Sequence, residues 1–250
     1  VKAMNHGKKS AIQQGIHHSQ NEYLLFTDAD CQPRSVNWIS KMVRYFDQET
    51  SFVLGYSPYR FKRNLANYLQ QYETLLTACL YTSAAHFHKP YMAVGRNLAY
   101  RKSVFMKSDK FKSHLNLLSG DDDLFIQQMA TKKNTKVCLA TDAFVDSKPV
   151  KDVRQLFYQK LRHISTADHY DVKDRFLLAM FYVARLGILT GFLFLFFSAD
   201  QHLVVALSLL GYFIFLQLAY FYPCRKLGAS KINWHIPLLE FFLVIFQLAL

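Results

Sequence analysis

One stretch of the chain reads Glu22-Tyr23-Leu24-Leu25-Phe26-Thr27-Asp28-Ala29-Asp30, an apolar run that ends on two carboxylates. A short apolar run bounded by polar residues is typical of a buried strand. Charge is expensive to bury, so carboxylates at a strand end usually hold a metal, move a proton or cap a helix. The stretch therefore predicts a sheet with a polar site at its edge.

Around this run, short apolar stretches alternate with amphipathic ones. Helical spacing covers residues 8–18, 35–46, 65–84 and 123–130, and strand-like runs cover residues 22–27, 52–55, 91–94, 97–100 and 136–140. Such alternation indicates an α/β layered domain with a mainly parallel sheet. We expect this domain to occupy residues 1–150.

The C-terminal part of the chain is more apolar. Residues 151–175 combine apolar residues at helical spacing with basic side chains, which is typical of an interfacial amphipathic helix or of an ordinary surface helix. Apolar segments follow at about 176–197, 203–222 and 236–250. The first two are long enough to span a bilayer, and the third is shorter. Arg185 and Glu240 interrupt the first and third, and such charges usually face the protein or a headgroup.

Charge and composition fit a membrane protein. The chain of 250 residues is 51% hydrophobic and carries a formal charge of +12. A basic excess fits nucleic acid, an anionic membrane or a phosphate-bearing substrate, and the sequence shows no nucleic-acid-binding signature. Residues 198–202 contain no Lys or Arg, whereas residues 223–235 contain three. This asymmetry places the second loop and the α/β domain on the cytoplasmic side.

Two acidic clusters are the candidates for chemistry. Asp28 and Asp30 follow the predicted strand, at the sheet edge where open α/β sheets bind ligands. Mg²⁺ is often held by one or two carboxylates together with substrate phosphates, although the pair could equally cap a helix.

The second cluster is Asp121-Asp122-Asp123, which follows Gly120 and opens a helix-like segment. Adjacent carboxylates repel, so at least one should have a partner or a raised pKa. A carboxylate beside a reacting hydroxyl can act as a general base, whereas an acidic residue at a helix start can simply cap it. We expect Asp122 to do chemistry and Asp123 to cap the helix.

Further along the chain, Gln159 and Arg162 stand three residues apart, on one face of a predicted helix. An arginine there could bind a diphosphate in a forked geometry, and the alternative is a solvated basic face. The four cysteines form no CxxC pair, which argues against a structural zinc site.

Taken in order, these motifs resemble those of the family 2 inverting glycosyltransferases, which have a GT-A fold and include membrane-anchored members. Asn5-His6-Gly7-Lys8-Lys9-Ser10-Ala11 resembles the segment N-x-G-K-x-x-A, Thr27-Asp28-Ala29-Asp30 resembles the DxD motif, Gly95-Arg96-Asn97-Leu98-Ala99-Tyr100-Arg101 resembles G-x-N-x-A-Y-R, Gly120-Asp121-Asp122 resembles G-[ED]-D, and Gln159-Lys160-Leu161-Arg162-His163 resembles Q-x-x-R-W. The resemblance covers residues from about 2 to 165 and also the apolar C-terminal part.

The resemblance implies a nucleotide-diphosphate sugar donor, a lipid-linked or saccharide acceptor, and Mg²⁺ or Mn²⁺ as cofactor. It implies that Asp30, with Asp28, binds the metal and that Asp122 is the catalytic base. The matching positions imply substrate-binding residues at Lys8, Asp28, Asn97, Asp121, Gln159 and Arg162. It also implies an integral protein of a bacterial-type inner (plasma) membrane that acts on cell-envelope polysaccharide, with its catalytic domain in the cytoplasm and no nucleic-acid partner.

The chain departs from the family pattern at two points. The family's first strand and its nucleobase-binding acidic residue should precede Val1, so we expect an N-terminally truncated piece. His163 stands where processive synthases have an acceptor-site Trp, which weakens any expectation of long-polymer synthesis.

Two other functions stay open. A metal-dependent phosphoesterase or nuclease also uses clustered carboxylates, but it would not need the apolar C-terminal part. A catalytically inactive membrane scaffold is the other alternative. The convergence of Asp28, Asp30 and Asp122 on one cleft would argue against the scaffold.

Overall fold

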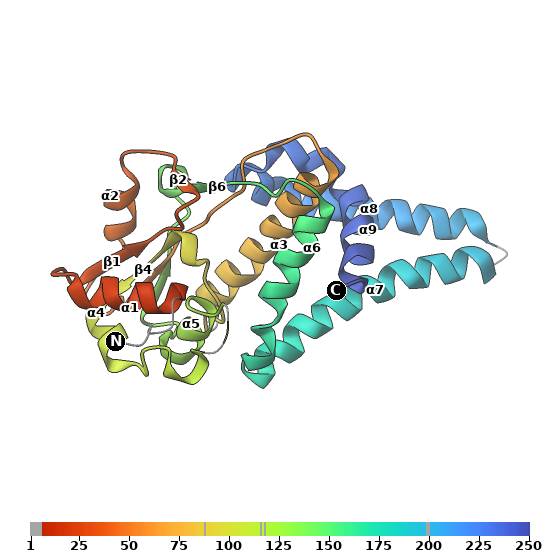
Figure 1. Ribbon diagram of the computed structural model, residues 1–250. Coiled ribbons are helices and arrows are strands. Elements are labelled where there is room, and N and C mark those ends of the chain that lie inside the picture. Colours follow the sequence, from red (N-terminus) through yellow and green to blue (C-terminus); the bar gives the residue numbers. More distant parts are fainter. Residues whose placement is uncertain (1–6, 88, 116, 118, 199–200) are drawn as a thin grey trace.

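The computed structural model describes residues 7–87, 89–115, 117, 119–198 and 201–250, and it shows an α/β region followed by long helices (Figure 1). The α/β region contains α1 (Lys8–His18), β1 (Tyr23–Phe26), β2 (Cys31–Pro33), α2 (Trp38–Val43), β3 (Phe52–Leu54), α3 (Leu65–Phe87), η1 (Gly95–Asn97), β4 (Leu98–Arg101), α4 (Lys102–Lys107), η2 (Lys112–His114), α5 (Asp123–Met129), β5 (Thr135–Val137), η3 (Thr141–Ala143) and β6 (Val145–Ser147). The helical part contains α6 (Val153–Ile164), η4 (Ala167–His169), α7 (Val172–Ser198), α8 (His202–Lys226), η5 (Ser230–His235) and α9 (Ile236–Leu248). Asn5 and His6 of the first motif lie outside the described residues.

The main sheet has the strand order β1-β4-β3-β5, and a separate ribbon pairs β2 with β6. In the main sheet β4 runs antiparallel to both β1 and β3, and β5 runs parallel to β3. The sheet is mixed as predicted: among the described strands β1, β3 and β5 run in one direction, and β4, inserted between β1 and β3, runs in the other.

The path of the chain after β3 explains the direction of β4. Residues 55–64 leave the sheet in an extended segment, where the Arg60 N–H donates to the Ser147 carbonyl of β6 at 2.9 Å. Helix α3 then brings the chain back to the end of the sheet where β3 finishes. There the Gly55 N–H donates to the Asn97 carbonyl at 2.9 Å. Because β4 starts beside the end of β3, it can only run antiparallel to it.

The two faces of the sheet follow the alternation of side chains along β3. Phe52 and Leu54 belong to the larger apolar core, which also contains residues of α1, α3 and α5. Val53 faces the other side and joins a smaller core with Met42 of α2. Alternate residues of a strand point to opposite faces, so helices cover both sides of this sheet.

Two local predictions differ from the structure. The helix expected over residues 35–46 is only α2, because the Ser35 hydroxyl accepts the Asn37 N–H at 3.0 Å and forms a turn before the helix. Residues 91–94 were expected to form a strand but are irregular. The N–H of the next residue, Gly95, bonds to the Asp122 side chain instead of a neighbouring strand.

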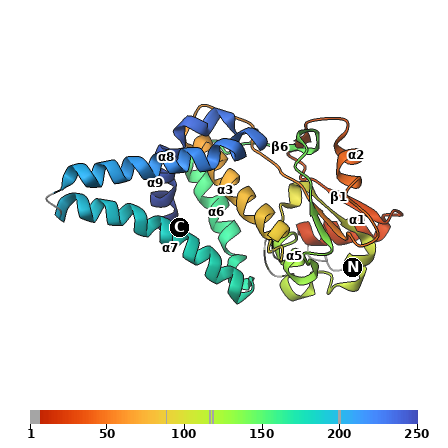
Figure 2. The same cartoon turned by 180° about the vertical axis from the view of Figure 1, so that it is seen from behind.

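Helices α7 and α8 project from the α/β region as a long hairpin (Figure 1, Figure 2). Within the described part of the chain, these two helices are long and apolar enough to cross a membrane. Helix α9 has 13 residues, fewer than the roughly 20 that a span requires, and it packs on α3, α7 and α8.

The charges inside the apolar segments face the protein, as expected. Arg185 of α7 and Glu240 of α9 are buried, and the Arg185 Nε and Nη2 atoms donate to the two Glu240 oxygens at 2.8 and 2.7 Å. Tyr72 of α3 donates to the same carboxylate at 2.8 Å. This cluster joins the helical hairpin to the long helix that supports the sheet.

Candidate active site

The two acidic clusters meet at the start of α1. The Lys8 Nζ atom lies 3.1 Å from Asp28 Oδ1 and 2.9 Å from Asp121 Oδ2. Asp121 is buried, whereas Asp28 and Lys8 are partly exposed. A single lysine thus holds together carboxylates that come from distant parts of the sequence.

Asp122 is held by two backbone groups. Its Oδ2 atom accepts the Gly95 N–H at 2.6 Å, and its Oδ1 atom accepts the Asp123 N–H at 2.9 Å. The second bond makes Asp122 the N-cap of α5. The prediction that Asp123 caps this helix is therefore wrong, because the Asp123 carboxylate points instead to Tyr170, whose hydroxyl donates to it at 2.7 Å.

Gly95 is needed for this approach. A Cβ atom built at Gly95 would lie 2.9 Å from Asp122 Oδ2, closer than carbon atoms normally come to such a group. A glycine is therefore required at this position of the G-x-N-x-A-Y-R segment, because a side chain would keep the backbone N–H from reaching the Asp122 carboxylate.

The surroundings of Asp122 favour a carboxylate that can accept a proton. Burial, and then the negative charge of Asp121, raise the pKa of Asp122 to about 6, while Lys8 and the two backbone N–H groups oppose the rise. Burial by itself would lower the pKa of Lys8. The negative charges of Asp121, Asp122 and Asp28 outweigh this effect and raise the pKa above its ordinary value. Asp122 is therefore ionised near neutral pH and close to its titration range, as suits a general base.

A small cavity of about 60 Å³ connects these groups. Its polar lining includes Lys8, Asp28, Gly95, Asp121 and Asp122. It adjoins an open groove of about 690 Å³ between α1 and β1, and both are lined by Lys8 and Asp28. Asp28 and Asp122 thus face one space, as expected if the two clusters act together.

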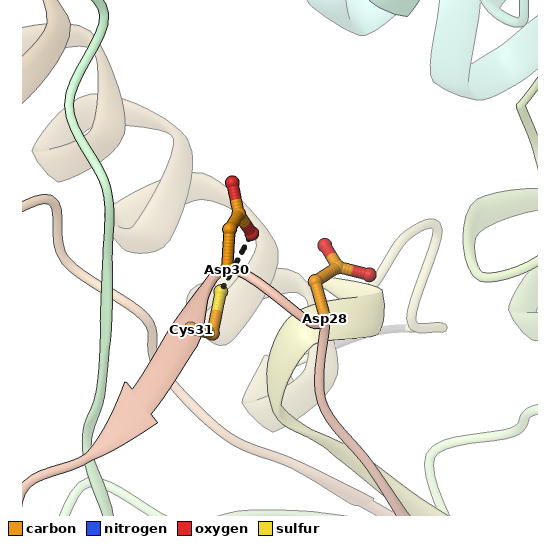
Figure 3. Close-up of side chains that lie close together, drawn as sticks. All are labelled: Asp28, Asp30 and Cys31. Carbon is orange, nitrogen blue, oxygen red and sulfur yellow. Dashed lines mark hydrogen bonds between the residues drawn. The ribbon is translucent and has the colours of Figure 1, made fainter.

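Asp28, Asp30 and Cys31 form a group whose possible ligand atoms all lie within 4.8 Å of one another (Figure 3). The Cys31 thiol donates to Asp30 Oδ1 at 3.5 Å and lies 3.2 Å from the Ser147 hydroxyl. Burial raises the pKa of this thiol, which keeps it protonated and makes it a poor ligand for a hard cation. The two carboxylates, by contrast, are the kind of oxygen ligands that Mg²⁺ and Mn²⁺ prefer.

Asn97 is fully buried and bonded within the protein. Its Nδ2 atom donates to the carbonyls of Tyr56 and Ala143, each at 2.8 Å, and its Oδ1 atom accepts the Trp38 Nε1–H at 3.0 Å. The side chain thus ties three segments of the fold together. Its direct contact with a substrate stays a prediction that this geometry does not support.

Gln159 and Arg162 lie on α6. Gln159 Nε2 donates to the Tyr59 hydroxyl at 3.2 Å, and its Oε1 atom accepts from Gln70 at 3.0 Å, whereas Arg162 is exposed. His163 is exposed on the same helix, where partial desolvation and then the charges of Lys160, Arg96, Arg162 and Lys8 lower its pKa. The positive charges that act on His163 come from α1, η1 and α6. Contact of Gln159 and Arg162 with a substrate stays a prediction.

The motif analysis did not single out Arg96 and Tyr59. The Arg96 guanidinium lies 4.4 Å from the centre of the Tyr59 ring, and its Nη1 atom donates to the Tyr59 hydroxyl at 2.6 Å. Arg96 occupies a variable position of its motif, and Tyr59 lies outside every motif. Only the fold reveals this pair, which links η1 to Gln159 of α6.

Comparison with known families agrees with this geometry. Residues 1–108 match the family described as Glycosyl transferase family 2, so this part of the chain is a glycosyltransferase family 2 domain. The matched region contains Lys8, Asp28 and Asp30 and ends before Asp122. The family implies a GT-A fold and an enzyme that uses a nucleotide sugar. No curated protein sequence matches the chain.

Proposed function

We propose that this chain, whose residues 1–108 form a glycosyltransferase family 2 domain, is a membrane-bound enzyme that transfers a sugar with inversion. The donor is a nucleotide-diphosphate sugar, and the acceptor is a hydroxyl of a lipid-linked or glycan substrate. The observation that carries the proposal is the pairing of Lys8 with both Asp28 and Asp121 beside Asp122. It supports the proposal because the residues that we assign to the donor side and to the acceptor side line one small cavity.

On the donor side, Asp28 and Asp30 are the residues that would hold Mg²⁺ or Mn²⁺. A bound divalent cation would stabilise the charge on the leaving nucleoside diphosphate. Lys8 lies against Asp28 and adds a fixed positive charge at the same place. Arg162 is exposed on α6, and its forked donors would steady the diphosphate.

On the acceptor side, Asp122 takes the proton of the attacking hydroxyl. The hydroxyl oxygen then forms a bond to the anomeric carbon while the bond from that carbon to the diphosphate oxygen breaks. The two backbone N–H groups hold the carboxylate but leave lone pairs available, since each carboxylate oxygen can accept two hydrogen bonds. Attack opposite the leaving group gives inversion.

Membrane anchoring is supported by α7 and α8, whose large apolar side chains are mostly exposed. A soluble protein rarely exposes so large an apolar surface. Helix α6 lies between this hairpin and the α/β region, where an interfacial position suits its amphipathic sequence (Figure 1). Membrane anchoring favours a lipid-linked acceptor, and the basic loop after α8 favours a cytoplasmic catalytic domain in a bacterial-type inner membrane.

The test is the variant Asp122→Asn in membranes that contain the full-length protein. Labelled nucleotide sugars are screened first for transfer by the unmodified protein. We expect the variant to lose transfer by roughly 10²–10⁴-fold, the contribution of a general base, while donor binding stays within about twofold because Asn can still cap α5.

The matched control is Asp152→Asn, which changes the N-cap of α6 in the same way. It should transfer sugar at the normal rate. Normal turnover in Asp122→Asn would contradict the assignment of the base. Cleavage of phosphodiesters without any sugar transfer would instead support a phosphoesterase.

A further inference from the structure

The connection between α6 and α7, residues 165–171, lies along the segment that carries Asp122. The Ser119 hydroxyl donates to the Arg162 carbonyl at 3.2 Å, and the Asp171 N–H donates to Gln127 Oε1 at 2.8 Å. A Cβ atom at Gly120 would lie 3.5 Å from the methyl group of Thr166. Residues around the start of α5 therefore contact the end of α6 and then the connection that follows it, which we call the strap (residues 165–171).

Tyr170 makes the central contact of this strap. Its side chain is buried, and its hydroxyl donates to Asp123 Oδ2 at 2.7 Å. Within the described residues, the other Asp123 oxygen is buried without a hydrogen-bond partner. A buried carboxylate that is only partly satisfied depends strongly on the bonds it keeps. Those of Asp123 come from the Tyr170 hydroxyl and the Ala93 backbone, so the Tyr170 hydroxyl matters for where Asp123 lies.

The position of Asp123 in turn affects Asp122. The two residues share a peptide bond, and the N–H of that bond is the donor to Asp122 Oδ1 at 2.9 Å. If loss of the Tyr170 bond lets the backbone at Asp123 rotate, this N–H moves with it. The carboxylate of Asp122 then loses one of the two backbone bonds that fix its orientation.

We propose that Tyr170 is a positioning residue for the transfer reaction, which holds Asp123 and thereby orients the carboxylate of Asp122. The proposal rests on the proposed function, in which Asp122 is the base. Tyr170 stands two residues before α7, the first helix of the hairpin. It therefore links the orientation of the Asp122 carboxylate to the position where the hairpin begins.

The test compares Tyr170→Phe with Tyr72→Phe in the full-length protein in lipid nanodiscs. Both changes remove a tyrosine hydroxyl that donates to a buried carboxylate, at 2.7 and 2.8 Å respectively. We expect Tyr170→Phe to lower kcat about tenfold with the donor KM unchanged, since small misplacements of a reacting group cost this much or more. Tyr72→Phe should leave kcat unchanged even if it lowers the thermal midpoint equally.

A second measurement does not require activity. Amide hydrogen exchange of residues 119–127 should become faster in Tyr170→Phe and stay normal in Tyr72→Phe. Two substitutions of Asp123 complete the test. Asp123→Asn keeps an oxygen that can accept from Tyr170 and should retain more activity than Asp123→Leu, which cannot accept.

The outcomes separate the two proposals. Unchanged exchange at residues 119–127 in Tyr170→Phe would overturn the positioning role, and so would equal kcat values for the two tyrosine variants. Full activity of Asp122→Asn would overturn the proposed function, whatever the tyrosine variants do.

Discussion

Two carboxylates that the described part of the chain withdraws from water, Glu240 and Asp122, are satisfied to different degrees. Glu240, between the long helices, meets the Arg185 guanidinium with both oxygens and also accepts from Tyr72. Asp122, in the cleft, accepts hydrogen bonds from two backbone N–H groups, and the negative charge of Asp121 opposes the positive charge of Lys8 around it. A fully compensated charge fixes structure, whereas a partly compensated one remains ready to exchange a proton.

The largest effect should come from breaking the compensated cluster. Arg185→Met leaves Glu240 buried without its cation, and the loss of one partner of a buried ion pair costs about 3–5 kcal/mol of unfolding free energy. We expect a strongly lowered thermal midpoint in detergent. Thr190→Val, at an exposed position of the same helix, is the control and should unfold normally. An unchanged midpoint for Arg185→Met would show that the pair contributes little.

The next effect should come from disturbing the cleft without changing its charge. Gly95→Ala pushes a methyl group toward Asp122 Oδ2, which must then move away from the backbone N–H that holds it. We expect kcat to fall about tenfold while the thermal midpoint changes little. Gly187→Ala adds a methyl where nothing lies within 4 Å and should keep full activity. If both glycine variants behave alike, close contact at Gly95 is not what positions Asp122.

The smallest effect should be a displacement of the pH profile. Since the pKa of Asp122 is about 6, the rate should fall roughly tenfold for each pH unit below that value as the base becomes protonated. Lys8 lowers the pKa of Asp122, so Lys8→Met should raise it. The acid limb of the pH–rate profile, in which the rate falls as Asp122 becomes protonated, should then move to higher pH. Lys107→Met, at the end of α4, removes one exposed positive charge and should leave the limb in place. A limb that moves to lower pH in Lys8→Met would contradict the electrostatic account.

The sequence predicted the features that depend on nearby residues. The apolar run before Asp28 is β1, the amphipathic stretch before the apolar part contains α6, and the first two apolar segments lie within α7 and α8. Arg185 faces the protein, which is one of the two positions expected for a charge in an apolar helix.

Features that depend on distant contacts could not be predicted in this way. The direction of β4 is set by the path of residues 55–64 against β6, which no periodicity reveals. The choice between Asp122 and Asp123 as the helix cap depends on Tyr170, far along the chain. The role of Arg96 likewise depends on a tyrosine outside every motif.

The position of β4 between β1 and β3 also affects when the sheet can form during synthesis of the chain. Among the described strands, β1 pairs with β4 alone, and β4 is the strand that joins β1 to β3. When β1 leaves the ribosome, its partner has not been made, and α3 must follow before it appears. The apolar side chains of β1 therefore wait unpaired, since long-range pairing is slow and exposes surfaces that can aggregate. A chaperone that binds nascent chains should be needed most before residue 101 emerges.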